Sequence, residues 1–320
     1  MKITLPIVAG LLSVYIFWGG TYLAMKFAIE TMPPFMMAGI RFMTAGAIVY
    51  AWQMTRGARQ PTVTHWKNAA IVGGLLLLGG NGGVVWAEQM VPSGIAAIIV
   101  ATVPLWMALL AWLWQGGTRP SGTIFFGLVL GFMGIILLVK NSGNDVANTA
   151  VPWIGYGALV AASLSWAVGS MYSRVAKLPD APFMAIAMQM LAGGFFCFLF
   201  GLITGEGGRL EIAQVSMHSA LALGYLIFFG SIVGFSAFIW LLKAADPTIV
   251  STYAYVNPIV AVILGWALAG EQMTIQDGLA AVIIVVAVII ITKGNQRKMT
   301  ANADKKLAAP GAIGIDGDGI

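Results

Sequence analysis

The chain has 320 residues, of which 59% are hydrophobic and 9% are charged, whereas a soluble globular domain has roughly 25% charged residues. A bilayer core of about 30 Å is crossed by about 20 apolar residues of helix. Apolar runs of that length fill most of the sequence, which predicts an all-α polytopic membrane protein. The formal net charge of +5 comes from scattered Lys and Arg residues with no nucleic-acid recognition motif, and the single cysteine, Cys197, excludes an internal disulfide.

Polar and Pro/Gly-rich interruptions divide the apolar sequence into ten predicted transmembrane helices. The first begins close to the amino terminus, and we interpret it as a membrane helix because no small-residue cleavage site follows it. The expected ranges are 6–29, 33–54, 66–89, 92–115, 121–140, 152–177, 181–204, 216–242, 247–270 and 274–293. The polar segment 294–320, rich in Gly and Ala, is expected to be a disordered tail.

The Lys and Arg residues of the loops predict the orientation, because cytoplasmic loops are enriched in both. With the amino terminus in the cytoplasm, thirteen cations fall on the cytoplasmic side and two, Lys140 and Arg209, fall on the outer side. The remaining two, Lys26 and Arg41, lie within predicted helices. We therefore expect both termini to be cytoplasmic.

The sequence contains an internal repeat. A shift of 148 residues aligns Trp18 with Trp166 and Lys26 with Arg174. The predicted repeats, each of five helices, cover residues 1–145 and 150–293. Because five is odd, the second repeat is expected to be inserted upside down relative to the first. Inverted repeats are the architecture of alternating-access carriers, whose substrate site lies near the membrane midplane.

Three segments resemble a known family: FWGGTYLAMKFAIETMPPFMMAGIRF, GNGGVVWAEQMVPSGIAAIIVATVPLW and STYAYVNPIVAVILGWALAGE. They are similar to the EamA family of the drug/metabolite transporter superfamily, and most of all to its YedA-type inner-membrane exporters. The resemblance covers roughly residues 5–293. It implies ten helices in two inverted repeats, a central cavity, and export of small metabolites or amphipathic compounds. In many members a glutamate follows the fourth helix of each repeat; Glu271 matches it here, whereas Gly117 stands at the equivalent place in the first repeat.

Candidate substrate-binding residues lie on helices related by the repeat. Trp18 is predicted near mid-membrane, away from the interfacial aromatic belt, where it either lines a cavity or packs between helices. The glycines of GGNGG (79–83) permit close packing of Asn81's helix or local unwinding that exposes carbonyl groups. Asn257 either lines a cavity or makes an interhelical hydrogen bond. The full set of candidates is Trp18, Tyr22, Asn81, Trp106, Trp166, Ser170, Tyr253 and Asn257.

Charged residues inside or beside the predicted helices are candidates for gating or charge pairing. Arg41 lies eight residues, or about 12 Å, inside the second helix, where an unpaired cation is costly and needs an acceptor. Glu88 is the expected partner of Arg41 or Lys26, either in a structural salt bridge or in a functional gate. Lys26 and Arg174 lie toward opposite membrane faces, and each is expected to stabilise the closed state of its own face. The set is Lys26, Arg41, Glu88, Arg174 and Glu271.

These patterns predict a secondary transporter that exports small metabolites or amino acids across the inner membrane, with export of amphipathic drugs as the alternative. No phosphate-binding loop is present, so a proton or substrate gradient is the expected driving force. Two isolated histidines do not form a metal site. We therefore expect no cofactor, no metal and no nucleic-acid partner, and a monomer or weak homodimer in the lipid bilayer. A membrane-embedded enzyme or a channel is the less favoured alternative.

Overall fold

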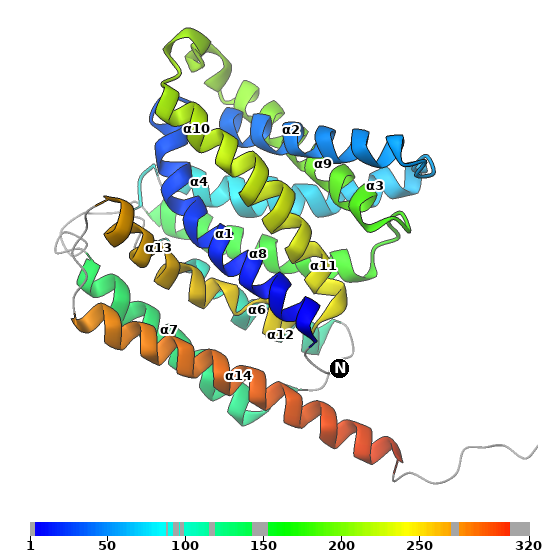
Figure 1. The fold of residues 1–320 in the computed structure, drawn as a ribbon, viewed down its shortest axis with the longest axis vertical. Helices are drawn as coiled ribbons and strands as arrows, with labels where there is room; N and C mark the ends of the chain where they lie inside the picture. The colour runs from blue at the N-terminus through cyan, green and yellow to red at the C-terminus, as the bar shows by residue number, and fades with distance from the viewer. Residues whose placement is uncertain are drawn as a thin grey trace, which may run out of the picture.

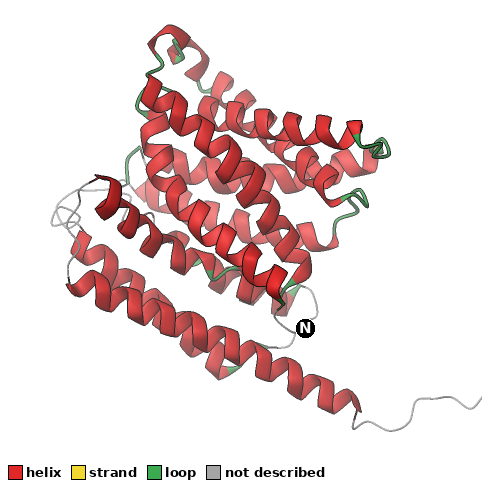
Figure 2. Cartoon of the chain, in the orientation of Figure 1, coloured by secondary structure: helices red, strands yellow, loops and turns green. Residues whose placement is uncertain are grey.

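A computed structural model of the chain describes residues 4–87, 89–91, 96, 99–114, 119–142, 153–269 and 275–307. The described residues form helices joined by turns and loops, and no strand occurs among them (Figure 2). Six helical segments are long and apolar enough to cross a membrane, judged by length and composition. They are Leu5–Ile29, Pro34–Thr55, Val63–Ala87, Trp153–Val175, Pro182–Ile203 and Met217–Ala244.

The amino-terminal part contains seven of the described helices. They are α1 (Leu5–Ile29), α2 (Pro34–Thr55), α3 (Val63–Gly73), the π-helix η1 (Gly74–Gly82), α4 (Gly83–Ala87), α6 (Val103–Leu113) and α7 (Gly122–Ser142). Helix α2 starts at Pro34, which fits the first turn because proline lacks the amide that would be unbonded there. Helix α3 is capped by Thr62, whose side chain accepts a hydrogen bond from the His65 amide.

The carboxyl-terminal part repeats this order of long helices. It contains α8 (Trp153–Val175), α9 (Pro182–Ile203), the short 3-10 helices η2 (Glu206–Arg209) and η3 (Ile212–Gln214), α10 (Met217–Tyr225), the π-helix η4 (Leu226–Phe235), α11 (Ser236–Ala244), α12 (Pro247–Val250), α13 (Tyr253–Ala269) and α14 (Ile275–Leu307). Helices α3, η1 and α4 form one continuous span, as do α10, η4 and α11.

Helix α14 differs from the sequence prediction. It was expected to end at residue 293, with a disordered tail after it, but it continues to Leu307. The reason lies in the composition of residues 294–307, which include Gln, Arg, Lys, Met, Ala and Leu and no proline. These are good helix formers, and extending an existing helix needs no new nucleus. The rest of the predicted tail, residues 308–320, lies outside the described residues.

The helices pack into one bundle with α1 running through its middle (Figure 1). Helix α1 contacts α13 and the continuous α10–η4–α11 span, while α2 packs along α9 and α7 packs along α14. Glycines allow the close approach of α2 and α9: a Cβ at Gly46 would lie 2.8 Å from the Leu191 amide, and one at Gly194 would lie 2.7 Å from the Met43 amide. Small residues serve this purpose in helix pairs within membranes.

Candidate functional site

Four aromatic rings from four helices meet in the middle of the bundle. Trp18 of α1 lies 5.6 Å from Trp166 of α8 and 5.1 Å from both Phe238 of α11 and Tyr253 of α13, measured between ring centroids. Phe238 also contacts Trp166 at 5.4 Å and Tyr253 at 5.5 Å. Most of these pairs are edge-to-face or tilted, the arrangements that aromatic quadrupoles favour. We call these four residues the aromatic layer.

A cavity of about 90 Å³ lies against the aromatic layer. Its wall includes Trp18, Trp166 and Tyr253 from that layer, and Arg41, Asn81 and Asn257 as polar groups. The volume admits several water molecules or part of a small metabolite. It is smaller than the ~300–1,000 Å³ of pockets for drug-sized ligands.

The cavity occupies only one side of the aromatic layer. Along α1, the lining residues Thr21 and Met25 follow Trp18 toward the Ile29 end of the helix. Along α8, which runs the opposite way, Ala162 and Ser163 precede Trp166. The cavity therefore extends toward the end of the bundle where α1 finishes.

The other side of the aromatic layer is filled by side chains. Ile7, Leu11 and Val14 of α1 are buried there with Leu241 and Leu242 of α11 in the same hydrophobic cluster. The Tyr15 hydroxyl lies 2.6 Å from the Thr252 hydroxyl and joins α1 to the turn before α13. This end of the bundle is closed by packing and by a polar bridge.

Two π-helices build opposite parts of the cavity wall. A π-helix widens the backbone by one residue per turn and is frequent at functional sites. The Gly230 carbonyl in η4 accepts a hydrogen bond of 2.9 Å from the Trp18 indole N–H, and the Leu75 carbonyl in η1 accepts one of 2.8 Å from Ser165. The GGNGG segment is helical throughout, in η1 and the start of α4, and a Cβ at Gly79 or Gly80 would lie within 3 Å of Ser165 or Trp166. Of the two alternatives for these glycines, close packing is therefore the one that the structure shows.

Glycines in the two π-helices leave room for the two tryptophans. A Cβ at Gly234 in η4 would lie 2.5 Å from the Trp18 indole nitrogen. A Cβ at Gly80 in η1 would lie 2.7 Å from a ring carbon of Trp166. Real side chains do not approach so closely, so each tryptophan position requires glycine at its π-helix.

Arg41 is buried in the cavity wall, with 4% of its surface exposed. Its Nε donates a hydrogen bond of 2.8 Å to the Ser231 hydroxyl of η4, and its guanidinium lies 4.6 Å from the centroid of the Phe42 ring. Its Nη1 has no hydrogen-bond partner among the described residues. No carboxylate from the described part of the chain forms an ion pair with Arg41. The expected partner, Glu88, lies outside the described residues, as does Glu271.

Two other polar atoms of the cavity wall also lack partners. They are Oδ1 of Asn81 and the indole nitrogen of Trp166, both buried. Asn257 differs, because its amide nitrogen, in the orientation that satisfies its neighbours, donates to the carbonyls of Tyr15 at 3.2 Å and Tyr253 at 3.1 Å. Asn257 thus lines the cavity and also makes the interhelical hydrogen bond that was its alternative interpretation.

The structure brings together most of the predicted substrate-binding residues. Trp18, Asn81, Trp166, Tyr253 and Asn257 line the cavity. Trp106 and Ser170 are not among its described lining residues: the Trp106 indole donates to the Thr102 hydroxyl at 3.1 Å, and the fully buried Ser170 hydroxyl donates to the Trp166 carbonyl at 2.7 Å. The side chain of Tyr22 lies outside the described part of the structure.

Some lining residues were not predicted from the sequence. Thr21, Phe42, Gly230 and Phe235 are examples. Thr21 and Phe42 are direct neighbours of predicted candidates along their helices, and helical spacing could have suggested Thr21, one turn after Trp18. Gly230 and Phe235 carry no such signal, because their position depends on how η4 packs against α1.

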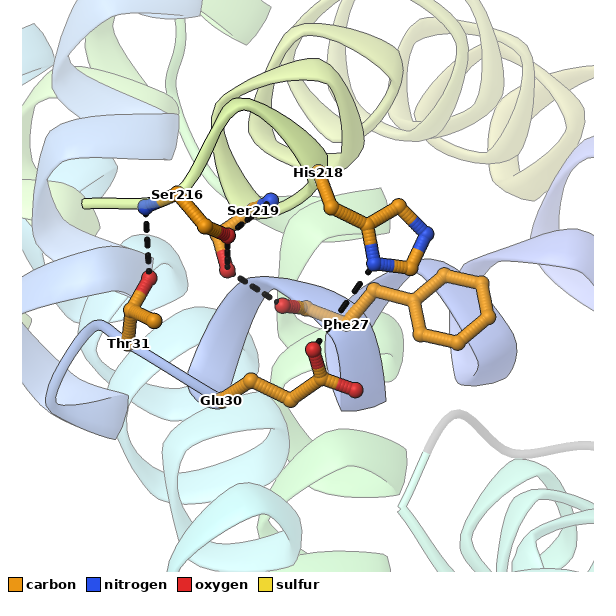
Figure 3. A network of polar contacts seen from close by, with 6 residues as sticks. All are labelled: Phe27, Glu30, Thr31, Ser216, His218 and Ser219. Atoms are coloured by element: carbon orange, nitrogen blue, oxygen red, sulfur yellow. Dashed lines mark hydrogen bonds and ion pairs between the residues drawn. The ribbon is translucent and has the colours of Figure 1, made fainter.

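Polar contacts also join α1 to α10 at the end of the bundle toward which the cavity extends (Figure 3). The Ser219 hydroxyl donates to the Phe27 carbonyl at 2.7 Å, and the Ser216 amide donates to the Thr31 hydroxyl at 3.3 Å. The His218 ring lies 3.7 Å from the Glu30 carboxylate. Both of these side chains are about half exposed. Even with His218 protonated, their attraction therefore contributes little to the stability of the fold.

The two predicted gating cations have different surroundings. Arg174, at the end of α8, donates from Nη1 to the Ala245 carbonyl at 3.2 Å, with the Asp246 carboxylate as a neighbouring negative charge. Lys26, at the other end of the bundle, is exposed and forms no ion pair with another described residue. The two sequence-related cations thus differ: Arg174 donates to a carbonyl, whereas no hydrogen bond or ion pair of Lys26 occurs among the described residues.

Comparison with known proteins places this architecture in a family. The chain is 42% identical over 291 residues to the uncharacterized inner membrane transporter YedA of Escherichia coli strain K12. The aligned region covers 91% of this chain and 92% of YedA. It is 27% identical over 290 residues to a chloroplastic WAT1-related protein of Arabidopsis thaliana, covering 88% of this chain and 68% of that protein. A solved crystal structure shares the fold, with a TM-score of 0.74 and 21% identity over 91% of this chain and 98% of the other.

The family's own sequence model matches the chain twice, over residues 5–140 and 153–293, which we call the first and second halves. Each tryptophan of the aromatic layer belongs to a different half. The two matches cover most of the sequence and confirm the resemblance seen in its motifs: the chain belongs to the EamA-like transporter family.

Proposed function

We propose that the protein is a secondary transporter of the inner membrane that exports small metabolites, amino acids among them, by alternating access. The observation that carries the proposal is the central cavity, which lies between helices of both halves and is bounded on one side by the aromatic layer. Carriers of this kind bind substrate near the bilayer midplane while two halves rock about the site. The printed name of the Escherichia coli relative supports the assignment to the inner membrane.

The proposal includes two five-helix halves in opposite orientations, with both termini in the cytoplasm. The distribution of loop cations, thirteen against two, supports this orientation. The Ile29 end of α1 then faces the outside, and the cavity lies on the outer side of the aromatic layer. The packing around Leu11 and Leu241 separates the cavity from the cytoplasm in the same orientation. The state is therefore assigned as closed to the cytoplasm.

The gating roles follow from the same orientation. Arg174 lies on the cytoplasmic side, and its contact with the Ala245 carbonyl belongs to the closed face. Lys26 lies toward the outside, and its ammonium would find its acceptor when that face closes. Their substitution by alanine should change the transport rate more than the substrate affinity.

Small metabolites are the proposed substrates, and amphipathic drugs are the alternative. A proton is the candidate coupling ion, and the two acidic residues predicted near the cavity helices, Glu88 and Glu271, are the groups to test for it. No cofactor takes part in the proposed cycle.

A metabolite-export comparison tests this function. Cells that overproduce the wild-type protein are compared with cells that overproduce Trp18→Ala or Trp166→Ala, and the medium is analysed by mass spectrometry. With the wild type, we expect the export rate of small metabolites to reach a plateau as their concentration inside the cell rises. Each variant should need a higher internal concentration to reach half of its maximal rate, because both rings border the cavity.

The matched control is Phe125→Ala on α7, whose side chain is 61% exposed on the bundle surface. It should export like the wild type. An unchanged medium despite normal membrane insertion of the wild type would refute the transport function.

A further inference from the structure

We propose that Arg41 is the anion-binding residue of the central cavity, and that the substrates of this transporter carry a carboxylate rather than a net positive charge. The inference rests on the proposed function and specifies its substrate class. It starts from three buried atoms of the cavity wall without hydrogen-bond partners: Nη1 of Arg41, the indole nitrogen of Trp166 and Oδ1 of Asn81. Four other buried polar atoms of the described residues, on Ser173, Gln189 and Ser236, also lack partners, but those residues do not line the cavity. The three on the cavity wall share one space that a ligand can fill, and buried polar groups are normally hydrogen-bonded.

The electrostatics favour an anion. Arg41 is the one charged side chain among the described lining residues, and no described carboxylate pairs with it. A buried guanidinium attracts an anion more strongly than an exposed one because the effective dielectric around it is lower. Its planar fork of N–H donors fits a carboxylate, and Trp166 adds a further N–H donor on the same cavity. A cationic substrate would meet repulsion at this wall.

The free acceptor adds a second feature. Asn81 Oδ1 accepts hydrogen bonds and lines the same cavity as the two donors. It is complementary to an N–H or O–H group carried beside the carboxylate, as in an α-amino acid or an α-hydroxy acid. The aromatic layer supplies an apolar floor for the rest of the molecule.

A purely structural role does not account for the charge at position 41. The bond from Nε to Ser231 joins α2 to η4, and the guanidinium also lies over the ring of Phe42 on α2 itself, but these contacts leave Nη1 without a partner among the described residues. The position related by the shift of 148 residues holds Gln189, which is also fully buried but is neutral and absent from the described cavity wall. The cation therefore occurs where the cavity is.

The test measures ligand binding by the purified full-length protein in detergent. Alanine, leucine and phenylalanine are each compared with their amides, with the corresponding deaminated acids and with the amines that lack the carboxylate, by thermal shift and calorimetry. We expect free acids of at least one side-chain size to bind and to raise the Tm, and the amides and amines to bind at least about 30-fold more weakly, which is the scale of losing a buried charge pair. Equal binding of amides or amines, or no binding by any acid, would overturn the proposal.

Variants then assign the contact to Arg41. Arg41→Gln should weaken acid binding at least about 30-fold, with Arg41→Lys between the two. Asn81→Leu should lower the affinity for the amino acids toward the affinity for the deaminated acids. Phe125→Ala on α7, whose side chain is 61% exposed and far from the cavity wall described above, should bind like the wild type. Normal acid binding by Arg41→Gln would overturn the assignment. If that variant does not fold, the comparison of acids with amides and amines on the wild-type protein decides the substrate class.

A flux measurement with the same compounds in proteoliposomes separates the two proposals. If acids bind through Arg41 but none crosses the membrane, the binding site stands and the transport function fails. If compounds without a carboxylate cross the membrane and Arg41→Gln transports them normally, the function stands and the binding site fails.

Discussion

The two tryptophans of the aromatic layer occupy matching positions in the two halves, but their surroundings differ in one bond. Trp18 donates its indole N–H to the Gly230 carbonyl in the π-helix of the second half. Trp166 packs against Gly80 in the π-helix of the first half, yet its indole N–H has no partner. Each tryptophan thus contacts the π-helix of the opposite half, and only one of these crossed contacts includes a hydrogen bond.

The difference indicates that the two halves have different conformations around a common plan. In the proposed cycle the halves exchange conformations when the carrier turns over, so the hydrogen bond should pass from Trp18 to Trp166 as the cavity opens to the cytoplasm. Carbonyl groups of both π-helices accept side-chain hydrogen bonds in this structure: Gly230 of η4 from Trp18, and Leu75 of η1 from Ser165.

The largest effect is expected from filling the space under the bonded tryptophan. Gly234→Ala places a Cβ 2.5 Å from the Trp18 indole nitrogen and should lower the free energy of unfolding by about 1–3 kcal/mol, the usual range for overpacking. Gly80→Ala, with its contact at 2.7 Å to Trp166, should destabilise less because no hydrogen bond is displaced. Denaturant titration in mild detergent measures both.

Gly224→Ala is the control on the same span, because a Cβ there meets nothing within 4 Å. It should stabilise the protein by about 0.5–1 kcal/mol through helix propensity. A loss of stability at Gly224 as large as at Gly234 would show that the contact with Trp18 is not the cause.

A smaller and more specific difference is expected when only the N–H group is removed. Trp18→Phe leaves the Gly230 carbonyl without this donor and should cost about 1–3 kcal/mol of unfolding free energy. Trp166→Phe removes a donor that has no partner and should cost less by at least about 1 kcal/mol. Equal losses in the same unfolding titration would contradict the asymmetry between the two halves.

The smallest effect is expected at the exposed end of the bundle. His218→Ala removes the contact with Glu30 at 3.7 Å, in which the two side chains are 57% and 48% exposed. Because exposed ion pairs contribute only about 0.2–1 kcal/mol, stability should change within that range. Ser219→Ala removes the hydrogen bond to the Phe27 carbonyl and should lower the free energy of unfolding by more than His218→Ala does. A larger loss with His218→Ala would show that the charged pair, and not the serine, holds this end of the bundle together.

The sequence predicted the positions of the long helices because their apolar length and Pro/Gly boundaries are local properties. Trp18 and Trp166 could be paired from the sequence because their spacing repeats. The π-helices could not be predicted, since GGNGG and the residues around Gly230 suit an α-helix equally well. Trp106 and Ser170 share the helices of the site, but contacts with Thr102 and with the Trp166 carbonyl place them elsewhere, and such contacts depend on packing.

In the proposed cycle, substrate reaches the cavity from one face of the membrane at a time, with the aromatic layer as the barrier. The direct measurement is labelling of single cysteines by a membrane-impermeant maleimide in intact cells, in a Cys197→Ala background. Met25→Cys lies on the cavity side of Trp18, and Leu11→Cys lies on the packed side. We predict that Met25→Cys is labelled from outside and Leu11→Cys is not. Labelling of Leu11→Cys from outside while Met25→Cys is protected would contradict the account.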